Sequence, residues 1–332
     1  MHLVSVIIPT FNRSMMIEKT LRSFLDQTID EESYEIIVCD NNSTDDTKLV
    51  LDRLIEEFPK RIRCFIEKRQ GVHYARNSAA KKSEGEILYF TDDDMIAEPD
   101  LLENLAKTFD FNPRIGSATG LVKPLFDKPP PKWVSKYLHN SWLSLTDKQN
   151  HHILVVSEEN CGIFSCHQAI RRKAFFESGG FNPENTDGVW VGDGETGLNL
   201  KIKELGYYFA YNSSSVIHHM IPPHRTTPSY LISRIGNQAY CDAYSEYRIH
   251  RNFIKHVFGM LKRNSFGLVR IYAGLVVKLA KDQISVIFLF AYIFYIRNRF
   301  IYDIKVLFKP RFRKIIEIDN WLGVDDELEI KI

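Results

Sequence analysis

Continuous apolar runs alternate with helically spaced apolar residues over the first hundred positions of the chain. Val4–Ile8 is β-branched and uninterrupted, which is typical of a strand buried on both faces. Within 16–26 the apolar residues recur at helical spacing and predict a helix. Further strands are predicted at Tyr34–Cys39, Ile62–Ile66 and Glu86–Phe90, with helices over 49–58 and 75–83. This order predicts an α/β fold, a mostly parallel sheet flanked by helices, with ligands at the carboxyl ends of the strands.

The pattern becomes less regular beyond residue 100. A proline-rich stretch at 128–132 breaks regular structure and predicts an irregular segment to about residue 150. From Pro228 onward the pattern is helical and rich in aromatic residues. We therefore expect an α/β domain over 1–225 and a helical C-terminal region over 226–332. The remaining predicted elements are helices at Leu101–Phe109 and Leu198–Leu205 and strands at Ile115–Val122, Tyr207–Ala210 and Ser215–His218.

Within the C-terminal region, Ile284–Ile296 is almost wholly apolar but has only about half the length that crosses a bilayer. Basic residues follow it closely: Arg297, Arg299, Lys305, Lys309, Arg311, Arg313 and Lys314. An apolar segment followed by cations suits a helix lying in a membrane interface. A buried helical hairpin or a dimer interface explains the apolar run equally well, so peripheral membrane contact and a homo-oligomer are both open.

Composition narrows the class of protein and its compartment. The chain has 332 residues, and its net charge of +1 gives no global field that would favour nucleic acid. Its five cysteines are odd in number and form no CxxC pair, which favours a reducing compartment over a disulfide or zinc framework. The apolar start lacks a charged leader. We expect a cytoplasmic protein, for which a place at the cytoplasmic face of the membrane is open.

The main candidate for chemistry is the run Asp92-Asp93-Asp94, directly after the predicted strand Glu86–Phe90. Adjacent carboxylates repel one another, so they require a cation, hydrogen bonds or raised pKa values. Their hard oxygen atoms suit a divalent cation at the sheet edge where α/β proteins bind ligands. A solvated acidic turn is the alternative.

Four segments in a characteristic order resemble family 2 glycosyltransferases, the inverting sugar-nucleotide enzymes of the GT-A fold. They are Val6–Asn12, Val38–Asp45, Gly71–Asn77 followed by Gly85–Ile87, and Phe90–Asp94, which matches the DxD motif. Each segment alone is weak evidence for the family. The four together make it improbable that Asp92-Asp93-Asp94 is only a solvated acidic turn. The resemblance implies a GT-A domain.

For the metal site, the resemblance implies Mn²⁺ or Mg²⁺ held by Asp94, with Asp92 sharing the ion or facing the ribose. Asp93 takes the variable position of the motif and is counted with the donor-binding residues. A histidine after the last core strand can complete the metal shell. The family position best fits His218, with His219 as the alternative and a structural role open for either.

The donor-binding residues that the resemblance implies lie mainly at the ends of the first two strands: Pro9, Thr10, Phe11, Asn12 and Asp40. Phe11 could stack on the base or belong to the core, and Asp40 could bind the base or cap a turn. Two arginines complete the donor-binding set. Arg76 could reach the phosphates or pair with an aspartate, and Arg225 could clamp the diphosphate from a mobile loop.

For the catalytic base, the family pattern is an acidic pair before a helix. Here that pair aligns with Gly194-Glu195, which makes Glu195 the base that deprotonates the acceptor hydroxyl. The first acid is displaced to Asp193, which is the second candidate. Two acids that merely begin a helix are the alternative explanation.

The prediction is a metal-dependent inverting glycosyltransferase that moves sugar from a nucleoside-diphosphate-sugar to a hydroxyl of a saccharide or lipid-linked saccharide. Cell-surface polysaccharide or glycan assembly is the setting that the family suggests. The rival hypotheses are a nucleotidyltransferase that makes the sugar nucleotide and a non-catalytic sugar-nucleotide-binding protein. The sequence names neither the donor nor the linkage.

Overall fold

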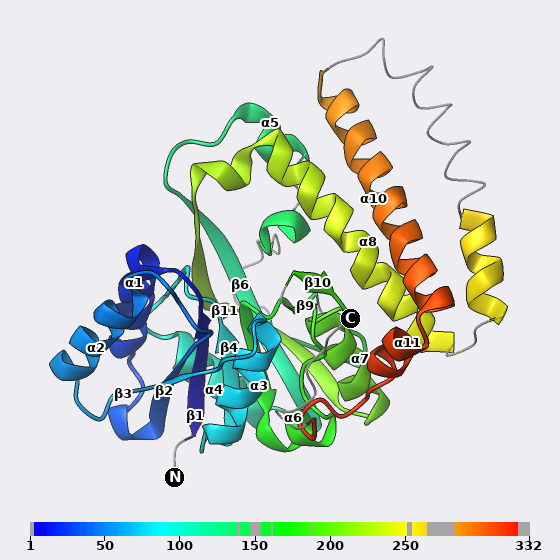
Figure 1. Ribbon diagram of the computed structural model, residues 1–332. Helices are drawn as coiled ribbons and strands as arrows, with labels where there is room; N and C mark the ends of the chain where they lie inside the picture. Colours follow the sequence, from blue (N-terminus) through cyan, green and yellow to red (C-terminus); the bar gives the residue numbers. More distant parts are fainter. Residues whose placement is uncertain are drawn as a thin grey trace.

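The computed structural model describes residues 3–137, 140–146, 154–160, 162–186, 188–250, 254–263 and 283–324. One large sheet lies between two layers of helices, and a group of C-terminal helices covers one end of this body (Figure 1). The predicted α/β fold with a helical C-terminal region is confirmed.

Four parallel strands build the first half of the sheet in the spatial order β3-β2-β1-β4. They are β1 (Val4–Thr10), β2 (Tyr34–Asp40), β3 (Ile62–Ile66) and β4 (Ile87–Thr91). Every residue of β1, β2 and β4 is buried, as their continuous apolar sequences predict. All four carboxyl ends therefore meet at one edge, and Asp92 begins the loop after β4.

The second half of the sheet is mixed. β8 (His167–Arg171) lies antiparallel between β4 and β6 (Ile115–Phe126). β11 (Tyr208–Ile221) pairs parallel with β6 and antiparallel with β5 (Met95–Ala97) and β7 (Leu154–Ser157). The pairing of β5 with β11 is important for the site, because β5 directly follows the three aspartates.

β11 corrects one sequence prediction. The two closing strands expected at Tyr207–Ala210 and Ser215–His218 are a single strand, whose register against β6 shifts between Asn212 and Val216. Such an irregularity is a β-bulge, which interrupts the alternation of side chains without ending the strand. A separate two-stranded sheet, β9 (Asn185–Thr186) and β10 (Val189–Trp190), lies outside the main one.

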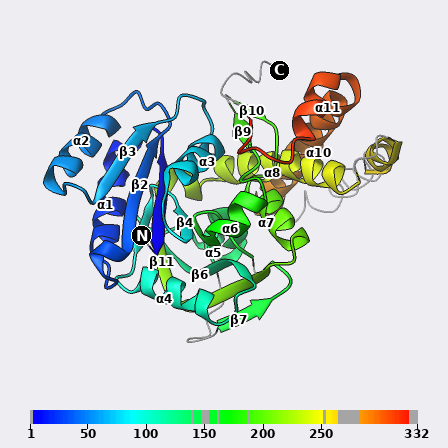
Figure 2. The same cartoon turned by 90° about the horizontal axis from the view of Figure 1, so that it is seen from below.

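Alternating residues of the strands build a core on each face of the sheet. In β1, Val6 and Ile8 pack into one core and Ile7 into the other. Figure 2 looks along the strands and shows α3 and α4 on opposite sides of the sheet. The helices of the first core are α1 (Ser14–Leu25), α2 (Thr47–Glu57) and α4 (Leu101–Asp110); those of the second are α3 (Val72–Lys82), α6 (Arg172–Glu177) and α7 (Glu195–Glu204).

The C-terminal helices form a third apolar cluster, in which Tyr244, Tyr302 and Phe312 are buried. α8 (Pro228–His250) and α10 (Gln283–Phe308) lie side by side, and α11 (Pro310–Ile316) follows (Figure 1). The inner face of the apolar run in α10 is thus buried against α8. Residues 254–263 are also helical, and the short elements are α5 (Lys132–Tyr137), η1 (Glu31–Ser33), η2 (Asn140–Leu143) and η3 (Pro223–Thr226).

Among the described residues, no helix combines the length and the apolar character that crossing a bilayer requires.

Candidate active site

The loop after β4 is fixed by the end of β1, because the two strands are parallel neighbours. Thr10 Oγ1 donates a hydrogen bond of 2.7 Å to Asp93 Oδ2, and Arg13 Nε lies 3.7 Å from Asp93 Oδ1. Burial and the neighbouring charge of Asp94 raise the pKa of Asp93 to about 7. Asp93 therefore anchors the loop to β1, and its carboxylate is already engaged by Thr10 and Arg13.

Asp94 is buried and faces two nitrogen-bearing side chains. Its Oδ2 lies 3.0 Å from Arg225 NH2 and 3.6 Å from His219 Nε2, while its Oδ1 is buried without a hydrogen-bond partner. Burial opposes the charged form, whereas the positive charges of Arg225 and Arg13 favour it, and the pKa of Asp94 lies below its usual range. Asp94 is therefore an ionised carboxylate with one oxygen unsatisfied.

The histidine beside Asp94 is His219, the alternative of the sequence analysis, and not His218. β5 pairs with β11 so that His219 lies opposite Met95, next to Asp94. Successive residues of a strand point to opposite faces, so His218 points away, and its Nε2 lies 2.6 Å from Glu98 Oε1. The preference for His218 is corrected because the sequence did not reveal which residue of β11 faces the loop.

The ring of His219 is held in one orientation. Its Nδ1 donates to the backbone oxygen of Leu143 at 2.8 Å, and its Nε2 accepts from Arg225 NH1 at 2.6 Å. These bonds assign the neutral tautomer with its lone pair on Nε2, the form that binds a metal ion. The unsatisfied oxygen of Asp94 and this imidazole are ligand types that a divalent cation such as Mn²⁺ or Mg²⁺ accepts, and the carboxylate of Asp92 lines the same cavity as Asp94.

A chain of polar contacts crosses the cavity floor from Asp92 to Glu195. Arg76, which is buried, pairs with Asp92 through NH2 and donates from NH1 to Ser165 Oγ at 2.9 Å. Ser165 Oγ in turn donates to Glu195 Oε2 at 3.2 Å. Arg76 therefore pairs with an aspartate, one of its two predicted roles, and connects the carboxylates on the two sides of the site.

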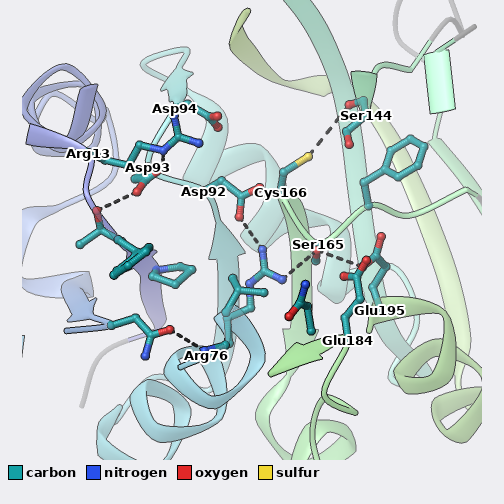
Figure 3. A pocket seen from close by; sticks show the side chains of 18 of the residues that line it. Arg13, Arg76, Asp92, Asp93, Asp94, Ser144, Ser165, Cys166, Glu184 and Glu195 are labelled. Atoms are coloured by element: carbon teal, nitrogen blue, oxygen red, sulfur yellow. Dashed lines mark hydrogen bonds and ion pairs between the residues drawn. The ribbon is translucent and has the colours of Figure 1, made fainter. Parts of the chain in front are cut away.

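One cavity of about 600 Å³ joins these groups. Figure 3 shows the three aspartates with Arg13 on one wall and Glu184 and Glu195 on the other. Nine of the predicted residues line it: Pro9, Thr10, Phe11, Arg76, Asp92, Asp93, Asp94, Glu195 and Arg225. Phe11 is 44% exposed, so it belongs to the cavity wall and not to the core.

Besides His218, three predicted residues do not line this cavity. Asn12 bridges two loops, since its Oδ1 accepts from Thr44 N at 2.8 Å, and Asp40 Oδ1 accepts from Ser43 N at 2.9 Å. Both therefore support the turns around the cavity, which for Asp40 is the turn-capping role left open by the sequence. Asp193 is buried behind the wall, as described next.

Glu195 and Asp193 occupy different environments although they are two residues apart. Glu195 is the first residue of α7 and lines the cavity. Asp193 is buried, with Oδ2 accepting from Ser245 Oγ at 2.5 Å and Oδ1 from Asn182 Nδ2 at 3.3 Å. Burial raises the pKa of Asp193 to about 6. Of the two acids, only Glu195 is in a position to contact an acceptor in the cavity.

The chain matches the model of the family "Glycosyl transferase family 2" over residues 5–180, more than half of its length. The chain belongs to glycosyl transferase family 2. Among its relatives, the glucosyl-dolichyl phosphate glucuronosyltransferase of Haloferax volcanii is 27% identical over 248 residues, which cover 71% of this chain and 75% of the relative.

A second relative is more similar over a shorter stretch. The GalNAc(5)-diNAcBac-PP-undecaprenol beta-1,3-glucosyltransferase of Campylobacter jejuni is 41% identical over 93 residues, 27% of this chain and 29% of the relative. The match thus spans less than a third of that protein. Among solved structures, the mannosyltransferase PcManGT of Pyrobaculum calidifontis, in complex with GDP-Man and Mn²⁺, has a TM-score of 0.59 at 20% identity, covering 91% of this chain and 87% of that one. This likeness supports the GT-A fold.

Several residues of this family 2 enzyme line the cavity without having been predicted, among them Asn41, Gln70, Ser165, Glu184 and Arg234. Asn41 lies within the segment Val38–Asp45 and Gln70 lies directly before Gly71–Asn77, so both could have been found from the segments that carry the resemblance. Glu184 and Arg234 lie in no motif, and only the fold brings them to the cavity. Arg234 is part of α8, so the C-terminal helices contribute directly to the site.

Proposed function

We propose that the protein is a metal-dependent inverting glycosyltransferase that moves a sugar from a nucleoside-diphosphate-sugar to a hydroxyl of a saccharide or lipid-linked saccharide. One observation carries the proposal: the carboxylates of Asp92 and Asp94 and the carboxylate of Glu195 line the same cavity of about 600 Å³. A cavity of this size accommodates a nucleotide sugar. The proposal therefore separates a donor side from an acceptor side.

On the donor side, Asp94, Asp92 and His219 would hold Mn²⁺ or Mg²⁺. The ion supplies positive charge to the diphosphate leaving group, on which negative charge develops during transfer. Phe11, at the mouth of the cavity, offers an exposed ring for stacking on the base. The GDP-Man and Mn²⁺ bound in the mannosyltransferase PcManGT support a donor and an ion of these classes.

On the acceptor side, Glu195 would take the proton of the attacking hydroxyl. Glu195 is the first residue of α7, so its carboxylate lies at the positive end of the helix dipole. The hydroxyl of Ser165 donates a hydrogen bond to Oε2 of Glu195, which leaves Oε1 of Glu195 to receive the proton. Attack from the side opposite the diphosphate inverts the anomeric carbon, and the separation of Glu195 from the aspartates across the cavity is consistent with that geometry.

Two relatives, which are named for transfer onto lipid-linked substrates, support the biological setting. We place the protein in cell-surface polysaccharide or glycan assembly, in the cytoplasm at the inner face of the membrane. The α/β part, to about residue 225, would bind the donor, and the helical part would complete the acceptor side and meet the membrane.

The membrane-facing surface would be the outer face of α10. Phe290, Phe294 and Phe308 are exposed there, and Arg297 lies over the ring of Phe294. At about 100° per residue these four positions fall within about 60° of one another around the helix. Aromatic rings and a cation on one face suit the interface of an anionic bilayer.

The proposal is tested by release of nucleoside diphosphate from UDP-, GDP- and dTDP-sugars, with and without Mn²⁺. We expect metal-dependent release that Asp94→Asn abolishes while the protein stays folded. Thermal stabilisation by the same nucleotides identifies the base. Release of pyrophosphate instead would support the nucleotidyltransferase, and no release from any donor would contradict a catalytic role.

A further inference from the structure

Gly194 occupies the position where the family pattern has the first acid of its pair, and the structure explains the glycine. Its φ is +58°, a backbone conformation that side chains disfavour. A Cβ added there would lie 2.9 Å from the imidazole of His73 and 3.2 Å from Glu184 Oε2. The space beside Gly194 is therefore already filled, and one of the groups that fill it is another carboxylate.

Glu184 lies just before β9 and faces Glu195 on the acceptor wall (Figure 3). Single ligand atoms of His73, Glu184 and Glu195 lie within 4.8 Å of one another. Burial, followed by the charge of Glu195, raises the pKa of Glu184 to about 7. Near neutral pH, Glu184 can therefore either donate to a hydroxyl or accept from one.

Arg234 brings a positive charge to the same wall from α8. It lines the cavity and is partly buried, and its charge interacts with Glu184 and Glu195. Within the described ranges, no side chain or backbone group forms a hydrogen bond or close ion pair with its guanidinium. A guanidinium has five N–H donors, so a cavity-lining one without partners is suited to bind a ligand rich in oxygen.

A second metal ion explains this cluster less well than a sugar does. Glu184 N donates to His73 Nδ1 at 3.3 Å, and Arg76 NH1 lies 3.4 Å from His73 Nε2. N–H donors thus face both ring nitrogens, which leaves no free lone pair for a cation. Positive charge from Arg76 on one side and Arg234 on the other also disfavours a divalent ion. Sugar hydroxyls, which donate and accept at once, match a carboxyl group beside a guanidinium.

We propose that Glu184 and Arg234 form an acceptor-recognition subsite, which binds hydroxyls of the acceptor sugar next to the one that Glu195 deprotonates. Glu184 supplies from the β9 side the carboxylate that position 194 lacks, and α8 supplies Arg234. The inference rests on the proposed function. The subsite gives the C-terminal helices, through Arg234 of α8, a role in acceptor specificity.

Two variants test the subsite, Glu184→Gln and Arg234→Gln, with Glu204→Gln as the matched control. Glu204 is exposed near the end of α7. The probes are methyl glycosides of glucose, galactose, N-acetylglucosamine, N-acetylgalactosamine and glucuronic acid, whose binding is measured by saturation-transfer NMR. We expect saturable binding of at least one glycoside to the wild type, weakened about tenfold or more in both variants and unchanged in Glu204→Gln.

Donor chemistry provides the separate readout. Metal-dependent hydrolysis of the sugar nucleotide with water as acceptor needs the aspartates and Glu195, so the wild type and the control Glu204→Gln should both show it. If Arg234→Gln unfolds, Arg234→Lys replaces it, since lysine keeps the charge but not the planar fork. Absence of glycoside binding in the wild type, or equal binding in all variants, overturns the subsite. Absence of donor hydrolysis in the wild type refutes the proposed function instead.

Discussion

Arg225 contacts both side chains that we propose as metal ligands on its side of the cavity. Its NH2 lies 3.0 Å from Asp94 Oδ2, and its NH1 donates to His219 Nε2 at 2.6 Å. The guanidinium therefore neutralises Asp94 and uses the lone pair of His219. Because a metal ion needs the same lone pair, Arg225 and the ion compete, and Arg225 must move when the ion binds.

This competition predicts that Arg225→Gln binds Mn²⁺ more tightly in the absence of donor, by about tenfold, because a charged hydrogen bond no longer has to be broken. Transfer should nevertheless become slower, since the displaced guanidinium is free to bind the diphosphate in the wild type. Calorimetric titration with Mn²⁺ measures the first effect and nucleoside diphosphate release the second.

The matched control is Arg13→Gln, which removes an arginine from the same wall. Arg13 faces Asp93, at 3.7 Å, and so should leave the Mn²⁺ affinity nearly unchanged. Weaker or unchanged Mn²⁺ binding in Arg225→Gln would mean that Arg225 does not compete with the ion.

The assignment of the base is tested by Glu195→Gln against Asp193→Asn. Glu195→Gln should lower kcat by about a hundredfold or more and keep donor binding, because glutamine cannot take the proton of the acceptor. Asp193→Asn should retain turnover, since its carboxylate is buried against Ser245 and Asn182. Single-turnover kinetics with saturating donor make the comparison. Loss of turnover in Asp193→Asn alone would reverse the assignment.

These two acids show what sequence can and cannot establish about the site. The spacing from the end of the helix selected Glu195. The sequence did not reveal which of the two acids, two positions apart, is buried and which lines the cavity. The same limit applies to His218 and His219, whose orientation depends on the pairing of β5 with β11. Glu184 and Arg234 could not be predicted, because only the folded chain places them beside Glu195.

The fold was predictable where its elements are regular. Ile62–Ile66 is a strand with the predicted bounds, and Tyr34–Asp40 extends its prediction by one residue. β8 was missed, since His167 and Gln168 interrupt its apolar character although both are buried. They are satisfied inside the protein: the ring of His167 contacts Tyr89 Oη at 2.8 Å. Buried polar residues with internal partners escape a prediction based on hydrophobicity.

The raised pKa of Asp193 predicts a pH-dependent stability difference between the wild type and Asp193→Asn. The unfolded chain releases this proton near pH 4 and the folded protein at about 6, so the folded state binds more protons between these values. The contribution of Asp193 to stability therefore falls as the pH rises through this window. Relative to the wild type, Asp193→Asn should gain about 2 kcal/mol between about pH 4.5 and about pH 7.5. Urea unfolding at both pH values measures it; an equal difference at both would show that the pKa is not raised.

The outer face of α10 predicts binding to anionic vesicles. Phe290 and Phe294 are 52% and 42% exposed, so about half of each side chain faces solvent. Each ring that enters the interface contributes about 1.5 kcal/mol or more, so the double variant should bind phosphatidylglycerol vesicles about a hundredfold more weakly. Flotation with such vesicles measures this, and salt should weaken wild-type binding because Arg297 and its neighbours attract the anionic surface.

Phe111→Ser is the control for the vesicle experiment, because Phe111 is 68% exposed and follows α4, far along the chain from α10. It should float like the wild type. Flotation of the double variant at the wild-type level would exclude this face as the membrane contact. A different result would identify the same aromatic face as a dimer interface. In that case the wild type would not bind vesicles, and ultracentrifugation would show a dimeric wild type and a monomeric double variant. The two results are distinguishable because a bilayer responds to the lipid charge and a dimer to the protein concentration.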